Sequence, residues 1–222
     1  MSSVKEVTPN GWIKYNKDSK ITAESIFKVH KSKMGLTDAD EIKIVSQEAD
    51  KTGRMHLKYK QFYKGIAIEG TDYTLHLIKG QLDLSHGRLV EDMDTKEKLN
   101  EKKALELAIK SIDTKIFAWE KKEWEDKLKE LKGDKRATFL PIGEKVITKK
   151  NKDVFTKDNF ALAWKFLIET AEPKNRYEVY VDANTGEVIR AKDTKMECFA
   201  DTKPKTNQSS IFEINAKQFS KP

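Results

Sequence analysis

The chain has little or nothing of three features that would narrow its function at once: cysteine, long apolar runs and a signal segment. Its 222 residues include one cysteine, Cys198, so neither an internal disulfide nor a cysteine metal cluster can form. No run approaches the roughly 20 apolar residues of a membrane-spanning helix, so we expect no membrane partner. The N-terminal sequence MSSVKEVTPNGW has no apolar segment of signal-peptide type. Either the protein is cytosolic, or a targeting segment was removed before this chain begins.

The charge of the chain does not indicate a nucleic-acid partner. The 43 lysines and arginines exceed the 36 acidic residues, which gives a net charge of +7. In the most charged stretch, residues 101–136, eleven basic side chains are mixed with nine acidic ones. Such mixing is typical of a solvated helix face, and no basic stripe with interleaved aromatic residues is present. The excess of lysine favours solubility or a weakly acidic partner surface.

No motif for catalysis or for metal binding is found. None of the four histidines begins a His-Glu-x-x-His zinc motif, and the sequence has no Gly-x-Ser-x-Gly elbow, phosphate loop or dinucleotide fingerprint. A chain reversal near residues 69–72 would place His56 opposite about position 85, so we expect no site built from His56 and His76. Cys198 lies in a polar tail where nothing would fix it against a base. We therefore predict no catalytic residue, metal site or cofactor in this chain.

Hydrophobic periodicity and breaker residues predict three helices. The first spans Thr22 to about Met34, with Thr22 as N-cap and Gly35 as the stop. The second begins after an Asn100 cap and continues to about Ile112, and the third spans about 115–132 and ends at Gly133.

Alternation and glycine spacing predict strands in the remaining segments. Residues 41–90 have the pattern of an antiparallel meander, with an inward face that comprises Met55, Leu57, Tyr59, Gln61 and Tyr63. The stretch NFALAWKFLIET has one heavy apolar face, made of Phe160, Leu162, Trp164, Phe166 and Ile168. The stretch RYEVYVDANTGEVIRAKDT (176–194) is typical of a hairpin, because Asp182, Asn184 and Gly186 suit a tight turn. After Thr194 the pattern is that of an exposed tail. The fold class is therefore α+β, with two consecutive modules in which an antiparallel sheet packs against one or two helices.

Two stretches resemble a known arrangement of modules. Residues 50–80 resemble the fungalysin/thermolysin propeptide module through Gly53, His56, Gln61, Tyr63, Gly65, Ile66, Ile68 and Gly70. The stretches ALAWKFLIE and RYEVYVDANTGEVI resemble the PepSY-type module, which is cystatin-like and follows it in thermolysin-like precursors, through Trp164, Asp182 and Gly186. On this resemblance we divide the chain into an extension (1–19), a propeptide-like module (20–97), a PepSY-like module (98–195) and a tail (196–222). Residues 115–135 would be a charged helical insertion in the second module.

The resemblance implies a non-catalytic pro-region that acts as intramolecular chaperone and inhibitor of a thermolysin-like zinc metallopeptidase, in cis or in trans. Zinc and calcium would belong only to the peptidase domain, with which Cys198 would be able to pair. Such a protein would be secreted or periplasmic after removal of a signal peptide. The residues expected to contact the peptidase are Tyr180, Arg190, Lys192, Phe199, Asp201 and Thr202. The alternatives are a free-standing secreted binding or inhibitor module that acts on a separate protease, and a small enzyme.

Overall fold

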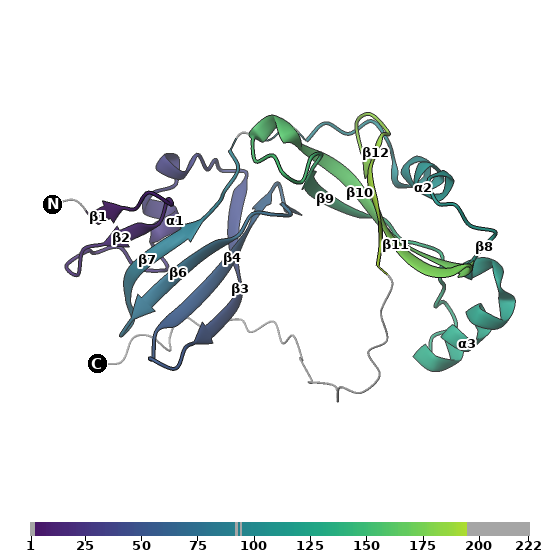
Figure 1. The fold of residues 1–222 in the computed structure, drawn as a ribbon, viewed down its shortest axis with the longest axis horizontal. Coiled ribbons are helices and arrows are strands. Elements are labelled where there is room, and N and C mark those ends of the chain that lie inside the picture. Colours follow the sequence, from purple (N-terminus) through teal and green to yellow (C-terminus); the bar gives the residue numbers. More distant parts are fainter. Residues whose placement is uncertain (1–2, 92, 94, 195–222) are drawn as a thin grey trace. The chain divides into compact units, whose positions relative to one another are not determined.

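The chain folds as two units, each an antiparallel sheet with a few short helices. The computed structural model describes residues 3–91, 93 and 95–194, and the two units meet in the sequence at residues 92 and 93. The ribbon in Figure 1 shows both sheets. The predicted α+β class with two modules is confirmed. The boundary at 97 and 98 stays a prediction.

The first unit contains a seven-stranded sheet with the strand order β1-β2-β7-β6-β4-β3, and β5 pairs with β4 beside β6. Its strands are β1 Val4–Val7, β2 Ile13–Tyr15, β3 Asp40–Ala49, β4 Met55–Tyr63, β5 Ile66–Ala67, β6 Tyr73–Ile78 and β7 Gln81–Gly87. The meander from β3 to β7 follows the predicted pattern. Residues 1–19, expected to be an extension, instead supply the edge hairpin β1–β2, which was missed because VKEV and IKY are too short to show alternation.

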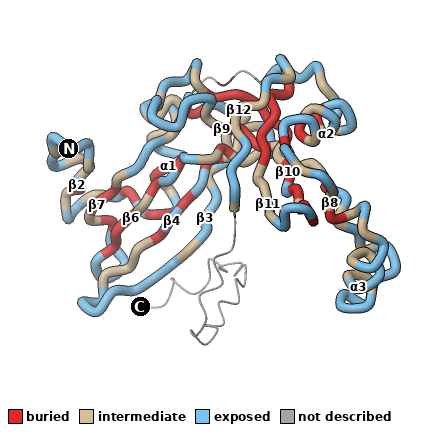
Figure 2. Tube along the Cα trace, turned by 45° about the vertical axis from the view of Figure 1, so that its right-hand side comes forward, coloured by how far each residue is buried: buried red, intermediate tan, exposed pale blue. Residues whose placement is uncertain are grey.

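One face of the first sheet carries the core, which is drawn in red along the central strands in Figure 2. The predicted inward face of β4 is confirmed, because Leu57, Tyr59 and Gln61 are buried and Met55 and Tyr63 are half-buried. The other buried residues of this core are Tyr15, Ile21, Ala23, Ile26, Tyr73, Leu75, Leu77 and Leu82.

The prediction of one continuous helix from Thr22 to Met34 is wrong. The structure has the single turn α1 (Ile26–Val29) and the 3-10 turn η1 (Ser32–Met34). The side chains of Thr22 and Ser25 bond to each other's backbone amides instead of continuing a helix, as short hydroxyl residues often do. The stop at Gly35 is confirmed, because Gly35 has the left-handed conformation.

The second unit contains a five-stranded sheet with the order β12-β11-β10-β8, in which β9 also pairs with β10. Its strands are β8 Ile116–Phe117, β9 Glu144–Lys149, β10 Phe160–Glu172, β11 Lys174–Asp182 and β12 Val188–Asp193. The helix α2 (Glu101–Lys110) lies against β10 and β11 (Figure 1), and the side chain of Asn100 accepts a bond from the Lys103 amide as the predicted N-cap. The heavy face of β10 is buried as predicted. The 3-10 turn η3 (Lys157–Asn159) leads into β10.

The predicted third helix is shorter than expected. Residues 115–121 form β8 and the 3-10 turn η2 (Ala118–Glu120), and the helix α3 spans only Lys122–Lys132. Strand β8 is favoured because Phe117 pairs with Thr170 of β10, and Glu120 accepts a hydrogen bond from the Phe117 amide. The helix ends at the left-handed Gly133, as predicted. Among the described residues, no helix is both long and apolar enough to span a membrane.

Candidate functional site

The glycines of the propeptide-like pattern all lie in turns of the first unit. Gly53, Gly65 and Gly70 have φ angles of 79°, 77° and 80°, a region that side chains with a Cβ atom rarely adopt. Lys64 also has a positive φ, of 50°. Lys64 and Gly65 therefore form a two-residue turn of the type that best matches the twist of a hairpin.

This turn overturns the predicted register of His56. The chain reverses at Lys64–Gly65, several residues earlier than residues 69–72, because Tyr63 pairs with Ile66. Strand β6 continues the same ladder after a short loop, and His56 is placed directly opposite His76. The expectation that His56 lies opposite position 85 is therefore wrong, and the two histidines are neighbours.

The side chain of Gln61 binds the segment after β7 to the sheet through hydrogen bonds. Its side chain is fully buried, and it exchanges two hydrogen bonds with the backbone of Val90: Val90 N to Oε1 at 2.8 Å, and Nε2 to Val90 O at 2.6 Å. Nε2 also donates to Oδ1 of Asp40 at 2.7 Å. The side-chain amide thus replaces a strand partner for a segment that has none, which explains why a polar residue lies on the inward face of β4.

Replacement of Gln61 by leucine should destabilise the first unit by about 3 kcal/mol, because the buried N–H and C=O of Val90 lose their partners. Denaturant unfolding of the full chain measures the change. The matched control is Lys60→Leu, at the neighbouring exposed position of the same strand. Equal stabilities of the two variants would show that the amide does not hold the Val90 segment.

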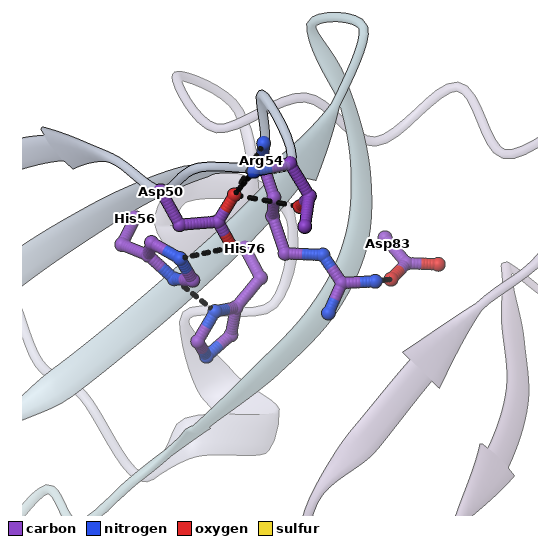
Figure 3. A network of polar contacts seen from close by, with 6 residues as sticks. Asp50, Arg54, His56, His76 and Asp83 are labelled. Atoms are coloured by element: carbon purple, nitrogen blue, oxygen red, sulfur yellow. Dashed lines mark hydrogen bonds and ion pairs between the residues drawn. The ribbon is translucent and has the colours of Figure 1, made fainter.

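The solvent-side residues of β4 and β6 form a polar network, shown in Figure 3. His56 Nδ1 lies 2.6 Å from His76 Nδ1, and His56 Nε2 lies 3.2 Å from Oδ2 of Asp50. Asp50 also accepts hydrogen bonds from the hydroxyl and amide of Thr52 and from the Arg54 amide. These bonds, first that of the Thr52 hydroxyl, hold the pKa of Asp50 well below its usual range. Arg54 in turn pairs with Asp83 at 3.1 Å.

The described part of the chain contains no group of three or more histidine, cysteine, aspartate or glutamate residues that could hold a metal ion. The histidine pair was missed from the sequence because pairing across strands depends on register, which the position of the turn sets.

The second unit presents a polar face on the side of its sheet away from α2. Tyr180 lies at its centre and is 2% exposed, because the Arg190 guanidinium lies 3.8 Å and the Lys165 ammonium 5.3 Å from the ring centroid. The Tyr180 hydroxyl donates to Glu178 at 2.8 Å, and Lys165 pairs with Glu178 at 3.2 Å. Arg190 also donates to the hydroxyl of Thr148 at 3.0 Å. We call Lys165, Glu178, Tyr180 and Arg190 the cationic face.

The charges of the cationic face compensate one another. Burial acts to raise the pKa of Glu178, but hydrogen bonds from Tyr180 and Lys165 and the positive charges of Lys165 and Arg190 outweigh it, so this pKa is lowered. Leu167 lies next to Glu178 across the strands and is 47% exposed. The face therefore combines fixed charges with an exposed apolar side chain.

Of the residues predicted to contact a partner, Tyr180 is buried rather than exposed. Arg190 is half-buried and Lys192 is exposed on the edge strand β12. Phe199, Asp201 and Thr202 lie outside the described residues. The contact roles of all six stay predictions.

The remaining motif residues shape the second unit. Trp164 is 8% exposed, and its indole N–H donates to the backbone oxygen of Leu99 at 2.9 Å. Asp182 accepts bonds from the amides of Asn184 and Thr185, and Gly186 has a φ of 81°. The hairpin thus has the turn chemistry that its sequence predicted.

Comparison with known families decides the identity of the first unit. Residues 40–89, which contain β3 to β7, match the family model described as the Fungalysin/Thermolysin Propeptide Motif. The first unit thus contains a fungalysin/thermolysin propeptide motif. The resemblance drawn from Gly53, His56, Gln61 and their neighbours is confirmed. The full sequence contains no His-Glu-x-x-His motif.

Two further proteins show some similarity to this chain. A bacillolysin of Brevibacillus brevis is 25% identical over 159 residues, which are 68% of this chain and 26% of the relative. The chain therefore spans about a quarter of that protein. The solved Bacillus megaterium YpeB C-terminal domain aligns over 83% of this chain and 72% of its own, with 13% identity and a TM-score of 0.33, a likeness too weak to assign a function.

Proposed function

We propose that this chain is the pro-region of a thermolysin-like zinc metallopeptidase, which it helps to fold and then inhibits. The observation that carries the proposal is the propeptide motif over 40–89, which occupies five consecutive strands of the first unit. Its glycines set turns, and its Gln61 holds a backbone segment on the sheet. The role we assign is therefore to present a stable surface to another polypeptide.

Assistance in folding follows from the kinetics of large domains. Pairings between distant segments form slowly, because the entropy of loop closure is lost before the contacts are gained. A pro-region that is already folded provides a fixed surface on which the peptidase can complete such pairings. The two sheets of this chain have many buried strand residues and can serve as that surface.

Inhibition follows if the same surface stays bound after folding. A covalently linked inhibitor acts at an effective concentration of about a millimolar, so even modest contacts block a cleft. Cleavage of the link removes this advantage. We propose that the cationic face and Lys192 of the neighbouring strand contact the peptidase, and that the protein is secreted. Zinc and calcium would bind to the peptidase and not to this chain.

Inhibition in trans tests this function. The purified chain, added to the mature bacillolysin peptidase of Brevibacillus brevis at tens of micromolar, should lower cleavage of a peptide substrate in a saturable manner. Unchanged activity across that range would overturn the inhibitory role.

A charge reversal tests the proposed contact. Lys192→Glu should weaken inhibition about threefold to tenfold, because reversing a charge at the rim of an interface mainly slows association. Lys51→Glu makes the same charge change in an exposed turn of the first unit and should leave inhibition unchanged. Equal losses in both variants would contradict a contact at β12.

A further inference from the structure

A row of aromatic rings crosses the solvent side of the first sheet. His56 meets His76 edge to face with ring centroids 4.7 Å apart, and His76 stacks on His86 at 5.1 Å. His86 stacks on Trp12 at 4.3 Å, and Trp12 also lies parallel to His76 at 6.0 Å. We call His56, His76 and His86 the histidine row, which Trp12 covers. His76 is only 9% exposed as a result.

The hydrogen bonds fix where the protons lie when the row is neutral. Asp50 can only accept, so His56 Nε2 carries a proton and His56 Nδ1 is bare. His76 must then donate from Nδ1 to His56 Nδ1 across 2.6 Å. This leaves His76 Nε2 without a proton, and that atom is buried with no hydrogen-bond partner among the described residues. A bare ring nitrogen tolerates such a place better than a charged N–H group would.

Protonation disrupts this arrangement in two ways. The facing nitrogens already share the Nδ1 proton of His76, so a proton added to His56 Nδ1 would place two N–H donors against each other. A charged His76 also has an N–H at its buried Nε2, which needs water. Trp12 and His86 cover His76, so hydration requires Trp12 to move. A charge on His86 alone would attract the Trp12 ring, and the opening therefore comes from the pair of His56 and His76.

The surrounding charges do not offset the energetic cost of protonating His56 and His76. Asp50 is already engaged by four donors, and the nearest acid on β7, Asp83, is paired with Arg54. Several charged or titratable groups lie on the strands and turns around His56 and His76. They are Glu48 on β3, Asp50 and Arg54 in the β3–β4 turn, Lys58 on β4, Asp83 and His86 on β7, and Lys14 on β2.

The direction of the pKa shifts agrees with the geometry. Burial first, and then the charges of His56, His86 and Arg54, lower the pKa of His76 to about 4, and burial lowers the pKa of His86. An unfolded histidine titrates near pH 6.5. The folded chain therefore binds fewer protons than the unfolded chain between about pH 6.5 and about pH 4, and stability falls as the pH falls through that window.

We propose that the histidine row is an acid-sensitive latch, which holds Trp12 on the sheet at neutral pH and releases it on acidification. The hairpin that carries Trp12 has few backbone pairs with the sheet, since β2 pairs with β7 at only two positions, Ile13 with Ser85 and Lys14 with Leu84, although Tyr15 anchors the end of β2 in the core. Release of Trp12 loosens the first unit and leaves the second unit unchanged. This inference goes beyond the proposed function and concerns the chain without any partner.

Fluorine NMR of the full chain, labelled with 5-fluorotryptophan, tests the latch directly. The chain has four tryptophans, and Trp12→Phe assigns the resonance of Trp12. Between about pH 7.5 and about pH 4.5, on either side of the histidine titration, this resonance should shift or broaden while that of Trp164 stays constant. A Trp12 resonance that stays constant through this range overturns the proposal.

Variants identify the group that takes up the protons. The drop in Tm of the first unit on acidification should shrink to about half or less in His76→Gln, because the variant lacks the buried titrating ring. His30→Gln, which changes the one histidine outside the row, should keep the drop of the parent chain. All samples contain EDTA, so that no bound metal contributes. Equal drops in the parent and His76→Gln overturn the latch.

A second variant is measured if His76→Gln does not fold. His56→Gln removes the other ring of the pair and with it the facing ring nitrogen, so it should also reduce the drop, and an unchanged drop in this variant overturns the proposal. No peptidase takes part in these measurements, and failure of the latch leaves the proposed function standing.

Discussion

Gly87→Ala should leave the first unit largely unfolded, with a loss of about 4 kcal/mol or more. Gly87 ends β7 with a φ of 143°, a conformation that residues with a side chain rarely adopt. A Cβ atom there would lie 2.2 Å from the backbone oxygen of Asp72 and 2.6 Å from the Cα of Tyr73. Both obstacles are backbone atoms of the adjacent strand segment, so no rotation of a side chain can relieve the clash.

Urea denaturation, monitored through Trp12, measures this effect. The matched control is Gly80→Ala, at another turn of the same unit, where φ is 78° and a Cβ atom would meet nothing within 4 Å. The control carries only the cost of the left-handed backbone, about 1 to 2 kcal/mol. Comparable stability of the two variants would contradict the close approach of β6 and β7 at this point.

Trp164→Ala should destabilise the second unit by about 4 kcal/mol, through the cavity left by the indole ring and the unpaired oxygen of Leu99. The ring is packed tightly, because a Cβ atom on Gly143 would lie 2.9 Å from its Cε3 atom. Trp164 lies on the heavy face of β10, which packs against α2.

Thermal unfolding of the second unit, measured in the full chain, checks this prediction. Trp124→Ala is the control, because Trp124 is half-buried on α3, a helix with no buried residue, and its removal should cost about 1 kcal/mol. A loss in Trp164→Ala no larger than in this control would show that the indole ring does not hold α2 and β10 together.

The strands with clear alternation could be predicted from the sequence, and their pairing could not. Residues 55–63 and 160–168 show which face is buried, because side chains alternate along any strand. The partner of His56 depends on where the chain reverses. Gly65 and Gly70 both suit a turn, and the pattern alone does not reveal that the reversal occurs at Lys64–Gly65.

The exposure of the candidate contact residues also could not be predicted, because it depends on which side chains of neighbouring strands cover them. Tyr180 alternates onto the outer face of β11, which predicts exposure, but Lys165 and Arg190 from the neighbouring strands cover its ring with their long side chains. The stack of Trp12 on His86 joins residues 74 positions apart in the sequence. Neither contact leaves a periodic signal in the sequence, so both required the structure.

Expression of a chimeric bacillolysin tests the proposed role of this chain in folding. In the Brevibacillus brevis bacillolysin, this chain replaces the segment to which it aligns, and the yield of active peptidase is compared with that of a bacillolysin from which this segment is deleted. The yield should be at least about tenfold higher with this chain, since the covalent link keeps its folded surface at an effective concentration of about a millimolar. The same chimera with Gly87→Ala should lose this gain. A yield no higher than that of the bacillolysin without this segment would overturn the proposed role in folding.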